Sequence, residues 1–216
     1  MNVKLSIAVF LLLSFFNLGA VTDMVNEQKK SFGAIEADMR NISEFEENGV
    51  KLQYKTREDA QKEISKIKRQ LNNNNDGNYR EISKKQFEIS RDNFHIDIKT
   101  WEEDKYNYFE IKVINKNPKY KTLYLKDMLK KIEDEKSYDE QYFLYYKGKK
   151  IKGDMDYYLN KLSNEEGIQK TNVLEIANGY AGIGDLSDGE RINFALIRYD
   201  TGSNIIIGTP TIFELY

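Results

Sequence analysis

The stretch "ERINFALIRYDTGSNIIIGTP" (residues 190–210) decides how this chain should fold. Successive side chains of a strand point to opposite faces, and its first strand is apolar on both. One face would carry Ile192, Phe194 and Leu196, and the other Ala195, Ile197 and Tyr199. A strand with one face in water would carry polar residues in one set. We therefore expect a central hairpin, turning at 200–203, that is either covered on both faces or leaves one face to a ligand. Pro210 cannot donate to a ladder and predicts a bulge or a strand boundary.

The composition is that of a soluble globular protein. The 216 residues include 40% hydrophobic and 31% charged residues, with no cysteine. The formal net charge of −2 and the isoelectric point near 5.7 argue against a nucleic-acid partner, because phosphate contacts need a basic face. The abundance of Asn, Ile, Lys and Tyr is typical of an AT-rich genome.

Residues 1–20, "MNVKLSIAVFLLLSFFNLGA", have the layout of a secretory signal peptide. Lys4 precedes an apolar run that is short for a permanent membrane span, and small residues follow it. We expect cleavage after Ala20, with retention as an anchor as the alternative, and no other membrane contact. The mature chain, 21–216, would then be secreted or held at the cell surface. Because no disulfide can form, a Gram-positive envelope is the expected setting.

Four segments have apolar residues at helical spacing. Their stripes are Phe32, Ile35, Met39 and Ile42; Ala60, Ile64, Ile67 and Leu71; Leu125, Met128, Leu129 and Ile132; and Met155, Tyr158, Leu159 and Leu162. For the second helix we expect a capping box formed by Thr56 and Asp59, and an ion pair between Glu58 and Lys62. Asp154 is the expected cap of the fourth.

The remaining segments alternate as strands do. The expected strands are 50–55, 85–90, 93–101, 106–115, 140–151, 172–184, 191–199 and 204–215, with turns at 91–93, 103–104 and 147–148 and a solvated loop at 72–78. Two stretches, approximately 24–118 and 119–216, share the order helix, strand, helix and about three strands of a meander. We expect them to be pseudo-repeats within one domain that build one antiparallel sheet with a shared core.

The C-terminal residues resemble the YwmB-like family, exported Gram-positive proteins often described as TATA-box-binding-protein-like. The resemblance lies in Gly179-Tyr180, in a strand with Asn193, Leu196 and Arg198-Tyr199, and in Gly208-Thr209-Pro210. Ala195 follows Asn193 by two residues, which departs from the family spacing. The likeness covers only the last forty or so residues.

This resemblance implies an α+β, TATA-binding-protein-like fold: duplicated halves forming one curved antiparallel sheet with helices on one face. It implies no activity, because none is established for the family. A saddle that reads DNA needs a basic underside and apolar wedges. An acidic, exported chain does not fit that role.

The sequence offers no catalytic or metal-binding constellation. "GYAGIGD" (179–185) lacks the helix that a phosphate loop requires and predicts a bend in a strand. The single histidine, His95, is expected on the sheet surface, since zinc needs several His or Cys ligands. "NNNNDGNYREI" (72–82) has too few carboxylates for calcium. We expect no metal and no cofactor.

Acidic clusters leave a rival interpretation open. They are Glu46-Glu47, Glu102-Glu103-Asp104, Asp134-Glu135 and Glu165-Glu166, all expected at turns or helix ends. A cell-wall hydrolase would need two such carboxylates facing each other in a cleft. We expect a non-catalytic protein, with this enzyme as the alternative.

Arg198 and Tyr199 form the most suggestive pair for binding. An arginine on an apolar strand needs either an internal partner such as Glu214 or the anion of a ligand. Outward tyrosines of 141–146, together with Tyr180 and Tyr199, could form an aromatic platform on a concave face. Tyr180, Arg198 and Tyr199 are therefore the candidate ligand-binding residues, and the expected ligand is an envelope peptide, glycan or protein.

Overall fold

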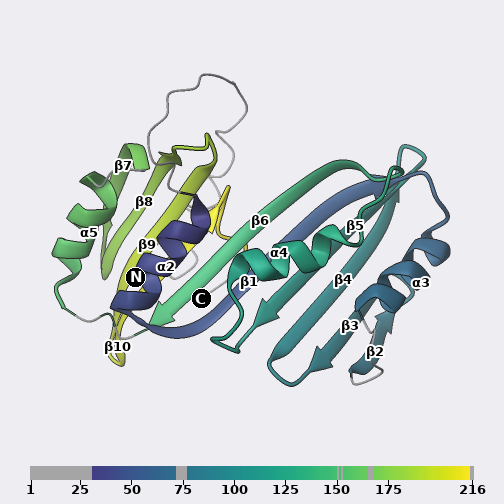
Figure 1. The fold of residues 1–216 in the computed structure, drawn as a ribbon, viewed down its shortest axis with the longest axis horizontal. Helices are drawn as coiled ribbons and strands as arrows, with labels where there is room; N and C mark the ends of the chain where they lie inside the picture. Colours follow the sequence, from purple (N-terminus) through teal and green to yellow (C-terminus); the bar gives the residue numbers. More distant parts are fainter. Residues whose placement is uncertain (1–30, 72–76, 150, 152, 165–167, 215–216) are drawn as a thin grey trace.

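A computed structural model describes residues 31–71, 77–149, 151, 153–164 and 168–214, without the side chains of 163 and 164. In these residues the protein is α+β, with one antiparallel ten-stranded sheet and four helices (Figure 1). The elements are α2 (Phe32–Ile42), β1 (Glu44–Thr56), α3 (Ala60–Leu71), β2 (Asn78–Ser83), β3 (Gln86–Arg91), β4 (Phe94–Glu103), β5 (Tyr106–Asn115), α4 (Thr122–Lys130), β6 (Tyr138–Lys149), α5 (Met155–Asn164), β7 (Ile168–Ile176), β8 (Gly179–Leu186), β9 (Arg191–Tyr199) and β10 (Gly202–Thr209). The expected signal peptide and residues 72–76 of the expected loop lie outside the described residues.

The order of elements repeats along the chain. Helix, strand, helix and four strands occur first as α2 to β5 and again as α4 to β10. The sheet order is β2-β3-β4-β5-β1-β6-β10-β9-β8-β7, so the first strand of each set lies at the centre. There β1 and β6 pair antiparallel, with Val50 opposite Leu144. Each set thus contributes five adjacent strands to one sheet.

The expectation of about three meander strands in each set was wrong. It missed β2, whose six residues are all exposed and carry no apolar alternation. It also took 172–184 as one strand, whereas a turn at Ala177–Asn178 separates β7 from β8. The turn expected at Lys147-Gly148 was wrong too, because β6 continues through both residues. A Cβ on Gly148 would come within 2.1 Å of the Ser43 hydroxyl oxygen, so a close approach explains this glycine.

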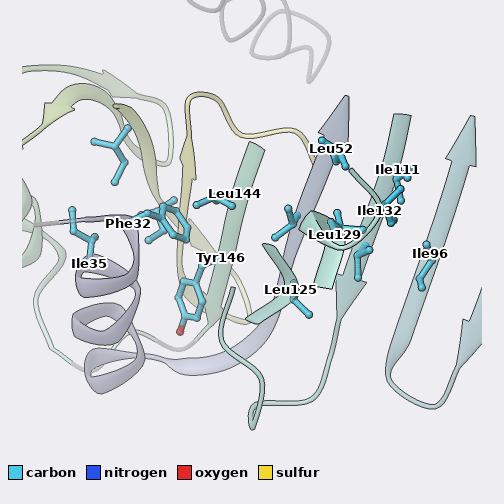
Figure 2. Packing of buried hydrophobic residues seen from close by; sticks show 14 of the residues in the cluster. Phe32, Ile35, Leu52, Ile96, Ile111, Leu125, Leu129, Ile132, Leu144 and Tyr146 are labelled. Carbon is cyan, nitrogen blue, oxygen red and sulfur yellow. The ribbon is translucent and has the colours of Figure 1, made fainter. Parts of the chain in front are cut away.

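All four helices pack on one apolar face of the sheet. Their buried residues share one cluster with alternate residues of the strands, in which Leu125 and Leu129 of α4 lie near Leu52 and Ile111, and Phe32 of α2 lies beside Leu144 (Figure 2). The members from the helices are Phe32, Ile35, Met39, Ile64, Ile67, Leu71, Leu125, Leu129, Met155 and Leu162. The four apolar stripes predicted from the sequence therefore define the covered face. We call the other face of the sheet the open face.

The centre of the open face is covered by the end of the chain. Strand β10 stops at Thr209, well before the expected end at 215, so Pro210 marks a strand boundary rather than a bulge. Ile212 and Phe213 then pack on a second apolar cluster. That cluster consists of Ile114, Tyr145, Ala195, Ile197 and Ile206. The hairpin of β9 and β10 is therefore buried on both sides, which is the first of the two arrangements that its sequence allowed.

The helix starts follow local polar chemistry. Asp59, rather than Thr56, caps α3, because its Oδ1 accepts from the amides of Gln61 and Lys62 at 3.0 Å. Thr56 instead accepts from the Glu58 amide at 3.1 Å, so the predicted capping box does not form. The predicted Glu58–Lys62 ion pair and the predicted Asp154 cap are both confirmed. Glu58 and Lys62 lie 2.7 Å apart, and Asp154 Oδ1 accepts from the Asp156 amide at 3.0 Å.

Candidate functional site

The three residues expected to bind a ligand line one pocket. This pocket, of about 410 Å³, lies where the β7–β8 turn, the end of β9 and the start of α5 meet. We call it the Arg198 pocket. Its lining residues are Met155, Glu175, Ile176, Ala177, Asn178, Gly179, Tyr180, Arg198, Tyr199 and Asp200.

The backbone fixes the inner wall of the Arg198 pocket. The Arg198 amide donates to the Asn178 carbonyl at 2.7 Å, and the Asn178 side-chain amide donates to the Arg198 carbonyl at 3.3 Å. A Cβ on Gly179 would come within 1.9 Å of the Leu196 carbonyl oxygen. Only glycine therefore permits β8 to begin this close to β9. The Gly-Tyr pair at 179–180 has a structural role: it brings the β7–β8 turn against Arg198.

Arg198 does not pair with Glu214, contrary to the internal partner suggested from the sequence. Glu214 pairs with Lys112 at 3.0 Å on the open face, because the chain turns away from the hairpin after Thr209. Arg198 is exposed, and the one hydrogen bond of its guanidinium to a described residue is with the Met155 sulfur, at 3.9 Å. Thioether sulfur is a weak acceptor. Most of the donors of this guanidinium are therefore available to a ligand.

Tyr180 faces the helices rather than the open face. It lies opposite Leu196, a member of the cluster under the helices, and its hydroxyl donates to Asp156 of α5 at 2.8 Å. That hydrogen bond raises the pKa of Tyr180, so the hydroxyl stays a donor. The expected platform combining Tyr180 with outward tyrosines of 141–146 is therefore not assembled, since Tyr145 lies on the opposite face beside Phe213.

A different aromatic surface lies on the open face, where β1 and β4 end and β5 and β6 begin. Trp101 and Tyr108, partners across β4 and β5, stack with centroids 5.4 Å apart and planes 9° apart. Tyr106 meets Tyr138 edge-on at 6.3 Å. We call these four residues the aromatic strip. Trp101 and Tyr138 are 39% and 45% exposed, so much of the strip faces solvent.

Cations flank the aromatic strip. The ammonium of Lys55 and the guanidinium of Arg57 lie 4.8 and 4.9 Å from the centroid of Tyr106. Further along the open face, the ammonium of Lys51 lies 4.1 Å from the Phe143 ring. Burial lowers the pKa of Lys51, with neighbouring Glu110 opposing that shift. A cation above an aromatic ring is attracted by the negative face of that ring. Lys55 is also paired with Asp139 at 2.5 Å, so Arg57 is the main positive charge beside the strip.

The aromatic strip could be found only once the register was known. Trp101 and Tyr108 flank the observed turn at 104–105 symmetrically, one residue beyond the predicted turn at 103–104, and each belongs to the outward set of its own strand. Both strands are evident in the sequence, but the strand pattern alone does not bring these two rings together. The third strand that contributes to the strip is β6, whose Tyr138 lies opposite Lys55 of β1. No spacing in the sequence predicts that contact.

The acidic clusters are dispersed in the described part of the chain. Glu46 and Glu47 lie within β1 rather than at a turn, because β1 is longer than expected. Glu46 pairs with Lys147 at 2.9 Å, and Glu47 accepts from the Tyr145 hydroxyl at 2.9 Å. The cluster at 165–166 lies outside the described residues. Two other carboxylates, those of Glu175 and Asp200, do lie together, because both line the Arg198 pocket.

His95 lies on the open face, as predicted, where its Nδ1 is 3.2 Å from the Ser90 hydroxyl oxygen. Among residues with described positions, no three His, Asp or Glu side chains are grouped to hold a metal ion. In that same part of the chain, none of the helices has the length and apolar character needed to cross a membrane. Comparison with known proteins adds no relative: no protein-family model matches this chain, and no curated protein is similar to it.

Proposed function

We propose that this chain is an exported, non-catalytic protein of the cell envelope that binds an extended peptide, glycan or protein partner through the open face of its sheet. The observation that carries the proposal is the aromatic strip. Four rings lie together on a face that none of the four described helices covers, and two of them are more than a third exposed. Exposed rings beside cations are typical of binding surfaces.

The position of the strip supports an extended partner. The described part of the open face between the strip and the C-terminal segment carries paired charges rather than apolar surface. Lys51 lies 3.8 Å from Glu110, and Lys99 lies 3.3 Å from Asp97. A chain-like partner could place rings or sugar faces on the strip and polar groups along these pairs. A compact apolar partner would remove water from these ion pairs without offering hydrogen bonds in its place, which is unfavourable.

We also propose that the fold is TATA-binding-protein-like and duplicated, as the YwmB-like resemblance implies. Two features support this: the repeated order of elements, and the pairing of β1 with β6 at the centre of the sheet. A partner other than nucleic acid is favoured by the net charge of −2. The Gram-positive envelope setting rests on the leader-like residues 1–20 and the lack of cysteine.

The test is co-sedimentation of the purified chain with isolated Gram-positive envelopes. Trp101→Ala and Tyr108→Ala should each reduce the bound fraction roughly tenfold, since one stacked aromatic contact contributes about 1 kcal/mol beyond its buried area. Tyr157→Ala is the matched control, because this tyrosine is 60% exposed on α5, on the other face. Equal sedimentation of wild type and both strip variants would exclude the strip as the binding surface. Pretreating envelopes with protease or with a glycan hydrolase distinguishes peptide from glycan.

Hydrolysis of a wall polymer is the second candidate function, and one observation favours it. Glu175 and Asp200 line the Arg198 pocket together, and two carboxylates in one pocket are what a glycosidase requires. The assay is release of reducing ends from purified wall polymer. Turnover by wild type that is abolished by Glu175→Gln would establish this function in place of the non-catalytic one.

A further inference from the structure

The charge arrangement of the Arg198 pocket defines a ligand class that differs from that of the open face. One guanidinium and two carboxylates, those of Glu175 and Asp200, line the pocket. None of these three groups forms an ion pair with another described residue, whereas most charged residues around the sheet do, as Arg191 does with Asp185 at 3.7 Å. The pocket therefore offers both signs of charge to a ligand.

The register of the sheet places the key groups on one face. Glu175 lies directly opposite Tyr180 across β7 and β8, and Tyr180 lies opposite Leu196, two residues before Arg198. Glu175, Tyr180 and Arg198 thus project on the helix side, where α5 begins with Met155. A positive and a negative group flank one tyrosine ring.

Asp156 is a weaker candidate for contact with a ligand. Its carboxylate accepts the hydroxyl of Tyr180 at 2.8 Å, which fixes the ring and uses part of the acceptor capacity. Tyr180 then presents its ring edge and face to the pocket. Met155, which is only 3% exposed, and Ile176 add apolar surface beside it.

We propose that the Arg198 pocket binds a free α-amino acid with an apolar side chain, its carboxylate on Arg198 and its ammonium group on Glu175. A guanidinium forms two parallel hydrogen bonds with a carboxylate, which sets both position and direction. Asp200 at the rim adds negative charge near the ammonium group. The side chain contacts Met155, Ile176 and Tyr180. A volume of about 410 Å³ is at the small end of the usual range for ligand pockets.

Three probes separate the contributions of the two charges. Calorimetric titration of the full-length chain should give saturable binding of l-leucine. N-acetyl-l-leucine lacks the ammonium group and l-leucinamide lacks the carboxylate, so each should bind roughly tenfold more weakly or worse. Equal affinity for all three probes, or no binding up to ~10 mM leucine, would overturn the proposal.

Variants give a crossed pattern that misfolding cannot imitate. Arg198→Gln should weaken leucine and N-acetyl-leucine roughly tenfold and leave leucinamide unchanged. Glu175→Gln should weaken leucine and leucinamide and leave N-acetyl-leucine unchanged. The matched control is Arg191→Gln on the same strand, which should bind all three as wild type does. Unchanged leucine binding by Arg198→Gln would refute the assignment.

A second measurement needs no variant. Leucine should shift the amide resonances of Gly179 and Arg198 in wild-type protein while leaving that of Trp101, on the other face, in place. Shifts confined to the strip would contradict the pocket. Because the strip and the pocket lie on opposite faces, this experiment can fail while envelope binding succeeds, and the reverse.

Discussion

Glu36 is the carboxylate on which the contact between α2 and the start of α4 depends. Its side chain is 1% exposed, accepts from Arg40 at 2.7 and 2.9 Å, and accepts from the Thr122 amide at 3.0 Å. Asn48 of β1 completes the group, donating to the Thr122 hydroxyl at 3.1 Å and accepting from Asn115 at 2.7 Å. These side chains join residues from α2, β1, β5 and α4.

Replacing Glu36 should therefore be costly. Glu36→Ala leaves the Thr122 amide without its acceptor and removes the carboxylate beside the buried part of Arg40, which keeps only the carbonyls of Pro118 and Tyr120. We expect a loss of about 3 kcal/mol in the free energy of unfolding, measured by urea denaturation. Glu88→Ala is the control. It removes an Arg80 pair 2.7 Å long whose arginine is 70% exposed, and it should cost at most about 1 kcal/mol. Similar losses for both variants would contradict the role assigned to Glu36.

Glu58 should give the molecule a measurable acid sensitivity. Hydrogen bonds from Lys136 at 2.8 Å and Lys62 at 2.7 Å hold the pKa of Glu58 at about 2, below its ordinary value of 4.5. A carboxylate with a lowered folded-state pKa stabilises the fold above pH 4.5, and this contribution disappears as the pH falls towards 2. We expect an NMR titration of the Glu58 carboxyl carbon to give a midpoint near pH 2, and Glu58→Gln to flatten the decline in stability over that window. A midpoint near 4.5 would show that the lysine contacts do not persist in solution.

At the scale of elements, the C-terminal segment covers the one apolar cluster described on the open face of the sheet. Ile212→Ser combined with Phe213→Ser should uncover the cluster around Ile206, lower the free energy of unfolding by about 2 kcal/mol, and increase binding of a hydrophobic dye. Ile82→Ala is the control, because Ile82 is 45% exposed on β2 and supports no packing. Unchanged dye binding by the double variant would mean that residues 212–213 do not cover the face.

The C-terminal hairpin and the segment after it show how much of the fold the sequence could predict. The double apolar alternation of β9 predicted either burial on both sides or one face left to a ligand, and the structure shows burial on both sides. Pro210 predicted a bulge or a strand boundary, and β10 ends at Thr209. What covers the second face could not be predicted, because residues 211–215 were expected to continue the strand. Their contacts with Ile114 and Tyr145 join segments far apart in the chain. Local alternation identifies buried faces, but it does not name the partner that buries them.

The candidate sites could be predicted only where a local signal in the sequence marks a residue. Arg198 was recognised because a charge interrupts an apolar strand, which is a local signal. Its neighbours Glu175 and Met155 were not identified, since the β7–β8 turn and the start of α5 reach it only through the fold. The strip was missed for a related reason. Its rings come from three strands, β4, β5 and β6, and β1 separates β6 from the other two.

At the scale of the whole molecule, the two sets of elements share one core and should unfold together. The cluster under the helices extends from Phe87 and Ile89 in the first set to Phe194 and Ile207 in the second without a break, across β1 and β6. Neither set could remove its central strand from water alone. Two sets that share one core in this way are expected to show one cooperative transition.

The single tryptophan makes this testable. Trp101 lies on β4, in the first set, and Phe194, 0% exposed on β9, lies in the second. Phe194→Ala should cost about 3–5 kcal/mol and lower the urea midpoint reported by Trp101 fluorescence as much as the midpoint reported by circular dichroism. Val173→Ala on the exposed edge strand β7 is the control and should leave both midpoints in place. If the Trp101 transition of Phe194→Ala stayed at the wild-type midpoint while the dichroism signal lost amplitude earlier, the two sets would be independent units, and the seam between β1 and β6 would be a contact between domains.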